Sequence, residues 1–184
     1  MDSYEVAGYA VLSAISASFQ IVHIGYPTPW GMWIDIVAIP WILAFFLYGW
    51  SGGLIVSSLG ALIITFVAPS TWLGAFMKWI ATLPMWLVPA MVKETRKLKL
   101  EDFKKASIVT LSLTLAIILR GFLTIPTNYY FAIPIWTGWS PEQAMLFLPW
   151  YIIFSLNAIQ GIFEFLVAWL LIFKFGLLRF SRWV

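Results

Sequence analysis

Long and nearly uncharged apolar runs cover most of this chain, and they restrict its folding more than any other feature. A helix of about 20 apolar residues is long enough to cross the hydrocarbon core of a bilayer. Of the 184 residues 62% are hydrophobic and only 10% are charged, whereas soluble domains are roughly one quarter charged. A water-soluble fold could not cover so much apolar surface. We therefore predict an all-α membrane protein in which residues 1–184 form a single integral membrane domain.

The apolar runs predict about six transmembrane helices. Two of them are short, with about 15 residues each, or roughly 22 Å at the rise of an α-helix. These two could instead form a buried or re-entrant hairpin closed at Gly52-Gly53. The predicted spans are residues 4–24, 36–50, 53–67, 73–92, 106–125 and 148–175.

Basic residues are concentrated in two segments. The stretch 93–105 holds six Lys and Arg residues and the stretch 174–182 holds three, together nine of the eleven in the chain. Because cytoplasmic loops of membrane proteins are enriched in Lys and Arg, we predict that both termini are cytoplasmic. The corresponding location is the plasma membrane, with lipid around the bundle.

Two connections on the predicted outer side, residues 25–33 and 126–145, are rich in aromatic residues, Pro and Gly. Aromatic residues are typical of the membrane interface, and a loop as long as the second one is often a lid or a binding loop. Within it, Ser140-Pro141-Glu142 predicts the start of a helix, with Ser as the N-cap and Pro in the first turn. Pro149 then predicts a kink or a new helix start.

No arrangement for covalent chemistry is visible. Gly49-Trp50-Ser51-Gly52-Gly53 matches a nucleophile pattern, but the single His, His23, is predicted a membrane thickness away from Ser51. The absence of Cys rules out a thiolate metal site, and no phosphate-binding loop for ATP is present. We therefore predict no enzymatic activity, no metal, no protein-bound cofactor and no nucleic-acid partner.

Four charged residues fall within or at the ends of the predicted spans: Asp35, Lys78, Arg120 and Glu164. Charges in lipid are costly and usually face a bundle interior or a cavity. Arg120 and Glu164 could pair with each other in a structural role. Lys78 could instead extend its ammonium group to the membrane interface, where the charge costs little. The role of Asp35 could be limited to capping the second span.

Polar residues form a stripe on the last span. Asn157, Gln160 and Glu164 are separated by three and four residues, which places them on one helical face. Such a stripe either lines a site or makes hydrogen bonds between helices. Asn128 lies among aromatic residues, where its amide could bind a planar polar ligand or belong to an interfacial belt.

The order of these features resembles the substrate-binding S components of energy-coupling factor (ECF) vitamin transporters, and most closely the riboflavin-binding subunits. The likeness covers about residues 7–178. Four segments are similar to family motifs: residues 33–40 to the opening of helix two, 47–53 to the turn before helix three, 127–131 to a Leu-Asn-Tyr segment, and 156–161 to an Asn-Leu-Ile-Lys-Gly segment.

The resemblance implies a six-helix protein with an outward-facing pocket for a small water-soluble vitamin, with riboflavin as the best single match. It also implies a transmembrane coupling subunit and two ATPase subunits as partners. Asn128 and Gln160 match positions that bind the flavin, and Ala10-x-x-x-Ala14 matches the helix-one motif that docks on the coupling subunit. Small residues at this spacing let another helix approach closely.

The sequence departs from the riboflavin-binding pattern at four positions. Ala38 replaces the second Asp of the helix-two motif, and Gln160 replaces a Lys. Lys78 stands where a neutral Asn is expected, and Arg120 has no counterpart. The added cations would suit a vitamin or precursor that carries a carboxylate or a phosphate.

We therefore expect vitamin capture by binding, with aromatic loop residues closing over the ligand. A channel or structural membrane protein and an intramembrane enzyme remain as alternative functions. The expected residues are Asn128, Tyr129, Gln160, Asn157 and Lys78 for substrate binding, Trp30 and Trp33 for the gating loop, and Ala10 and Ala14 for partner docking.

Overall fold

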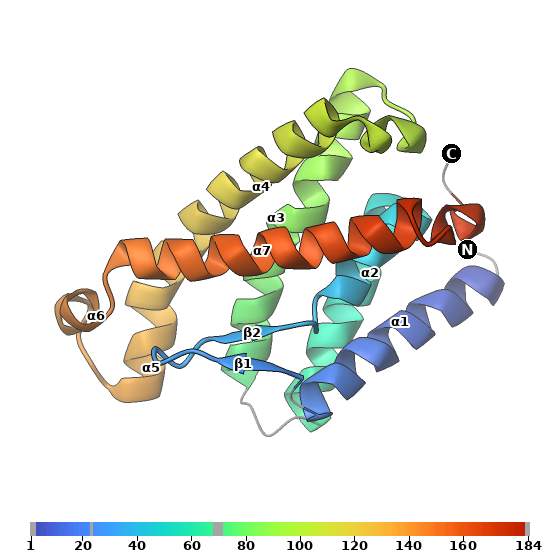
Figure 1. The fold of residues 1–184 in the computed structure, drawn as a ribbon. Coiled ribbons are helices and arrows are strands. Elements are labelled where there is room, and N and C mark those ends of the chain that lie inside the picture. The colour runs from blue at the N-terminus through green and yellow to red at the C-terminus, as the bar shows by residue number, and fades with distance from the viewer. Residues whose placement is uncertain (1–2, 23, 68–71, 183–184) are drawn as a thin grey trace.

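The computed structural model describes residues 3–22, 24–67 and 72–182, and these are mostly helical (Figure 1). His23 lies outside the described residues. The elements in chain order are α1 Ser3–Val22, β1 Gly25–Pro27, β2 Trp33–Asp35, α2 Ile39–Val67, α3 Trp72–Arg96, η1 Leu100–Lys104, α4 Ala106–Thr127, η2 Asn128–Ala132, α5 Ile133–Thr137, α6 Pro141–Phe147, α7 Trp150–Phe173 and η3 Leu177–Phe180.

Five helical stretches of the described chain are long and apolar enough to cross a membrane. By this measure the protein is an integral membrane protein. In lipid a backbone must satisfy its own hydrogen bonds, which is why such apolar runs become helices. The stretches are α1, α2, α3, the continuous helical segment Ala106–Thr137 and α7.

The expected count of six spans is not confirmed, because residues 36–50 and 53–67 contribute to the single element α2. Gly49 interrupts that element with φ 79° and ψ −168°, a conformation that glycine adopts without steric cost. Gly60 lies so close to Trp41 that a Cβ on it would be 2.5 Å from the indole Nε1. A straight helix would hold these residues about 28 Å apart.

The element α2 is therefore a helical hairpin, as the short runs allowed, and Figure 1 shows its two halves side by side. The expected closing point was wrong by a few residues. The chain turns at Gly49, while Gly52 and Gly53 provide close packing instead. A Cβ on Gly53 would be 2.9 Å from the Trp86 ring.

The chain termini, the turn of α2 and the basic loop lie at one end of the bundle. The backbone N–H of Arg182 donates to the carbonyl of Leu47 over 2.8 Å, and its guanidinium lies 5.4 Å from the Tyr4 ring. The Phe46 and Phe103 rings are 5.9 Å apart, which brings the basic loop to the same place. Figure 1 shows both termini together. The side of the membrane that this end faces stays a prediction.

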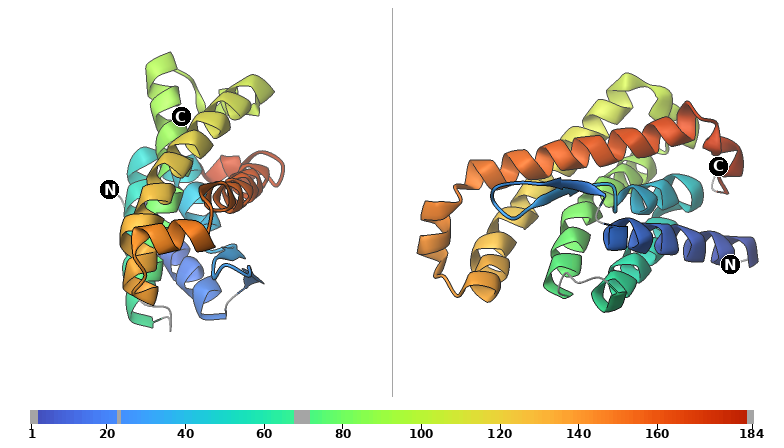
Figure 2. Two further views of the ribbon diagram at one scale, coloured as in Figure 1. Left: turned by 90° about the vertical axis from the view of Figure 1, so that its left-hand side faces the viewer. Right: turned by 60° about the horizontal axis from the view of Figure 1, so that its bottom comes forward.

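The opposite end of the bundle contains a feature that the all-α expectation missed. Residues 25–35 form a two-stranded antiparallel ribbon, in which Tyr26 is opposite Ile34. A Cβ on Gly25 would be only 2.6 Å from the Ile34 carbonyl oxygen, so the ribbon needs glycine there. The ribbon lies alongside α7 (Figure 2).

The segment 126–145 is not the long loop that the sequence suggested. Helix continues from α4 through the π-helical turn η2 into α5, and only residues 138–140 separate α5 from α6. Pro126 removes a backbone donor directly before the π-turn, a position where helices often widen. Ser140 caps α6 by accepting from the Gln143 N–H over 3.3 Å, and α7 begins after Pro149, both as expected.

Aromatic side chains fill the interior near the basic end. The Phe46 ring lies 5.7 Å from Phe165 and 5.8 Å from Phe173, in addition to its contact with Phe103. Phe45 is also fully buried in this cluster. Because these rings fill the bundle at the basic end, the open space inside the bundle lies at the ribbon end.

Candidate functional site

A cavity of about 520 Å³ lies between the ribbon, α3, α4, α7 and the short helices that follow α4. Its volume is within the range of small-molecule sites, which are usually mostly apolar with a few placed polar groups. The lining residues are Gln20, Trp30, Gly31, Met32, Trp33, Asp35, Gly74, Met77, Lys78, Ala81, Arg120, Asn128, Ile133, Trp136, Thr137, Trp139, Ala144, Phe147, Leu148, Asn157 and Gln160.

Most of the residues that the sequence singled out for binding line this cavity. Lys78 comes from α3, Asn128 from η2, and Asn157 and Gln160 from α7. Trp30 and Trp33, expected to close over a ligand, line it from the ribbon. Their binding and gating roles stay predictions.

Tyr129 is the exception among the expected binding residues. Its side chain is buried and does not line the cavity. The hydroxyl donates to the carbonyl of Leu148 over 2.7 Å, so Tyr129 ties the π-turn to the end of α6. Successive residues of a helix point about 100° apart, and of these two neighbours only Asn128 lines the cavity.

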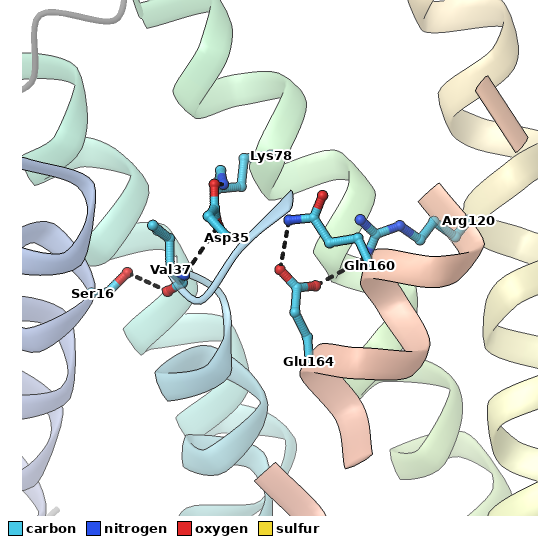
Figure 3. Close-up of polar contacts among 7 residues, drawn as sticks. All are labelled: Ser16, Asp35, Val37, Lys78, Arg120, Gln160 and Glu164. Atoms are coloured by element: carbon cyan, nitrogen blue, oxygen red, sulfur yellow. Dashed lines mark hydrogen bonds and ion pairs between the residues drawn. The ribbon is translucent and has the colours of Figure 1, made fainter. Parts of the chain in front are cut away.

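An ion pair joins the ribbon to α3 at the cavity wall (Figure 3). Lys78 donates to Asp35, so Lys78 does not merely extend to the interface. Asp35 Oδ1 also accepts from the Val37 N–H over 3.1 Å, within the turn that precedes α2, so this contact is not a cap of that helix, which begins at Ile39. Ser16 of α1 donates to the Val37 carbonyl over 2.8 Å and completes the connection.

A second ion pair lies deeper in the bundle. The Arg120 Nη1 to Glu164 Oε2 distance is 3.2 Å, and the two side chains are 2% and 0% exposed. This confirms the expected pairing of Arg120 with Glu164, which connects α4 to α7. Arg120 also lines the cavity, and its Nε donates to Asn157 Oδ1 over 3.2 Å. Removing either partner would leave a buried charge, which is strongly destabilising.

The amide side chains of the site are held by specific partners. Gln160 Nε2 donates to Glu164 Oε1 over 2.9 Å, and Asn157 Nδ2 donates to the Ile153 carbonyl over 2.9 Å. Asn128 Nδ2 donates to the Thr124 carbonyl over 2.7 Å. Asn157 and Gln160 of the stripe on α7 therefore line the cavity, and Asn157 also accepts a hydrogen bond from Arg120 of α4. A site-lining stripe and hydrogen bonding between helices, the two roles that the sequence allowed, are thus compatible.

The charges at the cavity are balanced. Among the described lining residues, Lys78 and Arg120 are cationic and Asp35 is anionic, and the Glu164 carboxylate lies directly against Arg120. Each cation thus already has a carboxylate partner. Because both cations are already paired, their presence gives less support to the expectation of an anionic ligand.

Several lining residues were not expected. Trp136, Trp139 and Phe147 reach the cavity because the chain from α5 to α6 folds against it. The abundance of aromatic residues in the segment 126–145, which contains the two tryptophans, was the available signal. Asp35 and Arg120 also line the cavity, whereas the sequence indicated only that such charges face a bundle interior or a cavity. Their position depends on helix packing, which one sequence does not specify.

The residues expected to dock a partner lie on the outside of the bundle. Ala10 and Ala14 are exposed on α1, whereas Tyr9, Ser13 and Ser16 on the other face are buried. This exposure leaves room for another helix. The docking role stays a prediction.

Comparison with known proteins finds similarity at the level of structure. No family model matches the sequence, and no curated protein matches it. A solved structure described as "Structure and mechanism of the S component of a bacterial ECF transporter" matches with a TM-score of 0.76. The sequences are 20% identical over 97% of this chain and 99% of that chain. The protein thus has the fold of an ECF transporter S component.

Proposed function

We propose that this protein is the substrate-binding S component of an ECF-type importer and captures a small water-soluble vitamin from outside the cell. The observation that carries the proposal is the cavity at the ribbon end, where Asn128, Asn157, Gln160 and Lys78 meet a set of tryptophans. The similarity in fold to an ECF S component over nearly the whole chain supports it.

Riboflavin is the ligand we propose first. A flat tricyclic ring suits a cavity lined by Trp30, Trp33, Trp136 and Trp139, because aromatic faces stack on one another. The amide side chains suit the polar edge of such a ring. A vitamin or precursor with a carboxylate or a phosphate is the alternative, for which Lys78 and Arg120 would have to exchange partners.

The proposed mechanism is binding and release without covalent chemistry. Residues of the ribbon turn, among them Trp30, would close over the ligand and exclude water. A transmembrane coupling subunit would dock on the exposed α1 face that carries Ala10 and Ala14, and two ATPase subunits would drive release to the cytoplasm.

The double variant Asn128→Ala/Gln160→Ala tests this proposal. We expect loss of riboflavin binding by the purified protein, measured by quenching of flavin fluorescence, while a cooperative thermal unfolding transition shows that the variant still folds. Gln143→Ala is the matched control, because Gln143 is an amide outside the cavity lining. Undiminished affinity in the double variant would remove Asn128 and Gln160 from the site.

A further inference from the structure

We infer that Glu164 orients the Gln160 amide and the Arg120 guanidinium so that the cavity presents an acceptor beside a donor. The matching ligand is an uncharged ring with an N–H next to a C=O, as in a lactam, an imide or a ureide. This inference rests on the proposed function and specifies the chemical class of its ligand.

The orientation of Gln160 follows from the chemistry of its partner. An ionised carboxylate only accepts hydrogen bonds, so the group of Gln160 that faces Glu164 must be the NH₂. The amide oxygen then lies on the side away from Glu164, as Figure 3 shows. No described residue donates to this oxygen, and Gln160 lines the cavity, so Oε1 is an acceptor available to a ligand.

Arg120 supplies the donor next to this acceptor. Its guanidinium has five N–H bonds. Within the described part of the chain two of them are used, one to Asn157 and one to Glu164. Arg120 and Gln160 bind the two oxygens of the same Glu164 carboxylate, at 3.2 Å and 2.9 Å, so their side chains are neighbours, and both line the cavity.

The charge balance argues against an anionic ligand. A carboxylate that bound Lys78 or Arg120 would have to compete with Asp35 or Glu164, whose side chains are only 6% and 0% exposed. The displaced protein carboxylate would then be a buried charge without a partner, which is strongly unfavourable. A neutral ligand edge can bind Arg120 and Gln160 while both ion pairs stay intact.

The experiment compares riboflavin with its N3-methyl derivative, in which a methyl group replaces the imide N–H. Pantothenate and nicotinate serve as anionic probes. We expect the wild type to bind riboflavin on the order of ten- to a hundredfold more tightly than the methylated compound, because methylation leaves a buried acceptor unpaired. We expect no binding of the two carboxylates.

Two variants test the role of Glu164 as a positioning residue. Gln160→Leu removes the acceptor, and the double change Arg120→Leu/Glu164→Leu removes the ion pair without leaving a single buried charge. In both we expect the affinity ratio between riboflavin and its methyl derivative to fall towards one. A purely structural role for Glu164 would lower both affinities and leave that ratio unchanged. Gln143→Ala should keep the wild-type ratio.

The outcomes separate this inference from the proposed function. Equal wild-type affinity for the two flavins, or an unchanged ratio in the double Leu variant, would overturn the inference alone. Binding of pantothenate or nicotinate but not riboflavin would also overturn it, while leaving a vitamin-binding subunit in place. Failure of the wild type to bind any of the four compounds would overturn this inference together with riboflavin as the ligand.

Discussion

The ion pair between Asp35 and Lys78 shows how single residues connect the ribbon to the bundle. Asp35 is the last residue of β2 and Lys78 lies within α3, so their contact bridges two segments 43 residues apart in sequence. Both side chains line the cavity. The pair therefore fixes the cavity wall and the base of the proposed gating ribbon together.

A double-mutant cycle on this pair gives a prediction at the residue scale. We expect Asp35→Asn and Lys78→Met each to lower the unfolding free energy, because each leaves one charge without its partner. The double variant should lose less than the sum, by an interaction energy of about 0.5–3 kcal/mol. Thermal unfolding in detergent measures it. Strictly additive losses would show that the contact contributes nothing to stability.

Sequence reasoning at the residue scale was correct where helical spacing or opposite charge determines the arrangement. The spacing of Asn157 and Gln160 on one helix placed both on the cavity face, and the opposite charges of Arg120 and Glu164 indicated their pairing. Tyr129, the neighbour of Asn128, does not line the cavity, and its binding role stays a prediction. Which of two adjacent helical residues faces inward depends on how the helix packs, which residue type alone does not encode.

At the scale of elements, the hairpin α2 depends on close contact between its two halves. Replacing Gly60 by Ala would place a Cβ 2.5 Å from Trp41 Nε1, so one half of the hairpin must move. We expect a loss of about 1–3 kcal/mol in unfolding free energy, as for other overpacked sites. The thermal unfolding midpoint of the purified protein measures this loss.

Ser58→Ala provides the control for that variant, because it places the same side chain on the exposed surface of the same segment. We expect no more than a small change there. If Gly60→Ala were as stable as Ser58→Ala, the two halves of α2 would not pack as closely as the structure has them.

The elements differ in how well a sequence predicts them. Long apolar runs identified α1, α3, α4 and α7, because lipid leaves helix as the structure that satisfies the backbone. The ribbon escaped prediction because its strands have three residues each, too few to show an alternating pattern. The turn at Gly49 was misplaced because Gly52 and Gly53 are equally able to turn, and packing decides among them.

At the scale of the whole molecule, the basic loop and the aromatic ribbon lie at opposite ends. The chain has no Cys, so single cysteines can be introduced and labelled without background. On intact cells we expect a membrane-impermeant maleimide to label Tyr26→Cys and to label Lys104→Cys only after permeabilisation. Both positions are exposed. The opposite labelling pattern would invert the predicted orientation.

The two ion pairs beside the cavity have an electrical consequence. With Lys78 and Arg120 balanced by Asp35 and Glu164, the cavity loaded with a neutral ligand carries no net charge. Moving one elementary charge through a potential of 100 mV involves about 2.3 kcal/mol. For the neutral ligand proposed above, binding to this charge-balanced site does not include that energy, so we expect the affinity to be independent of the membrane potential.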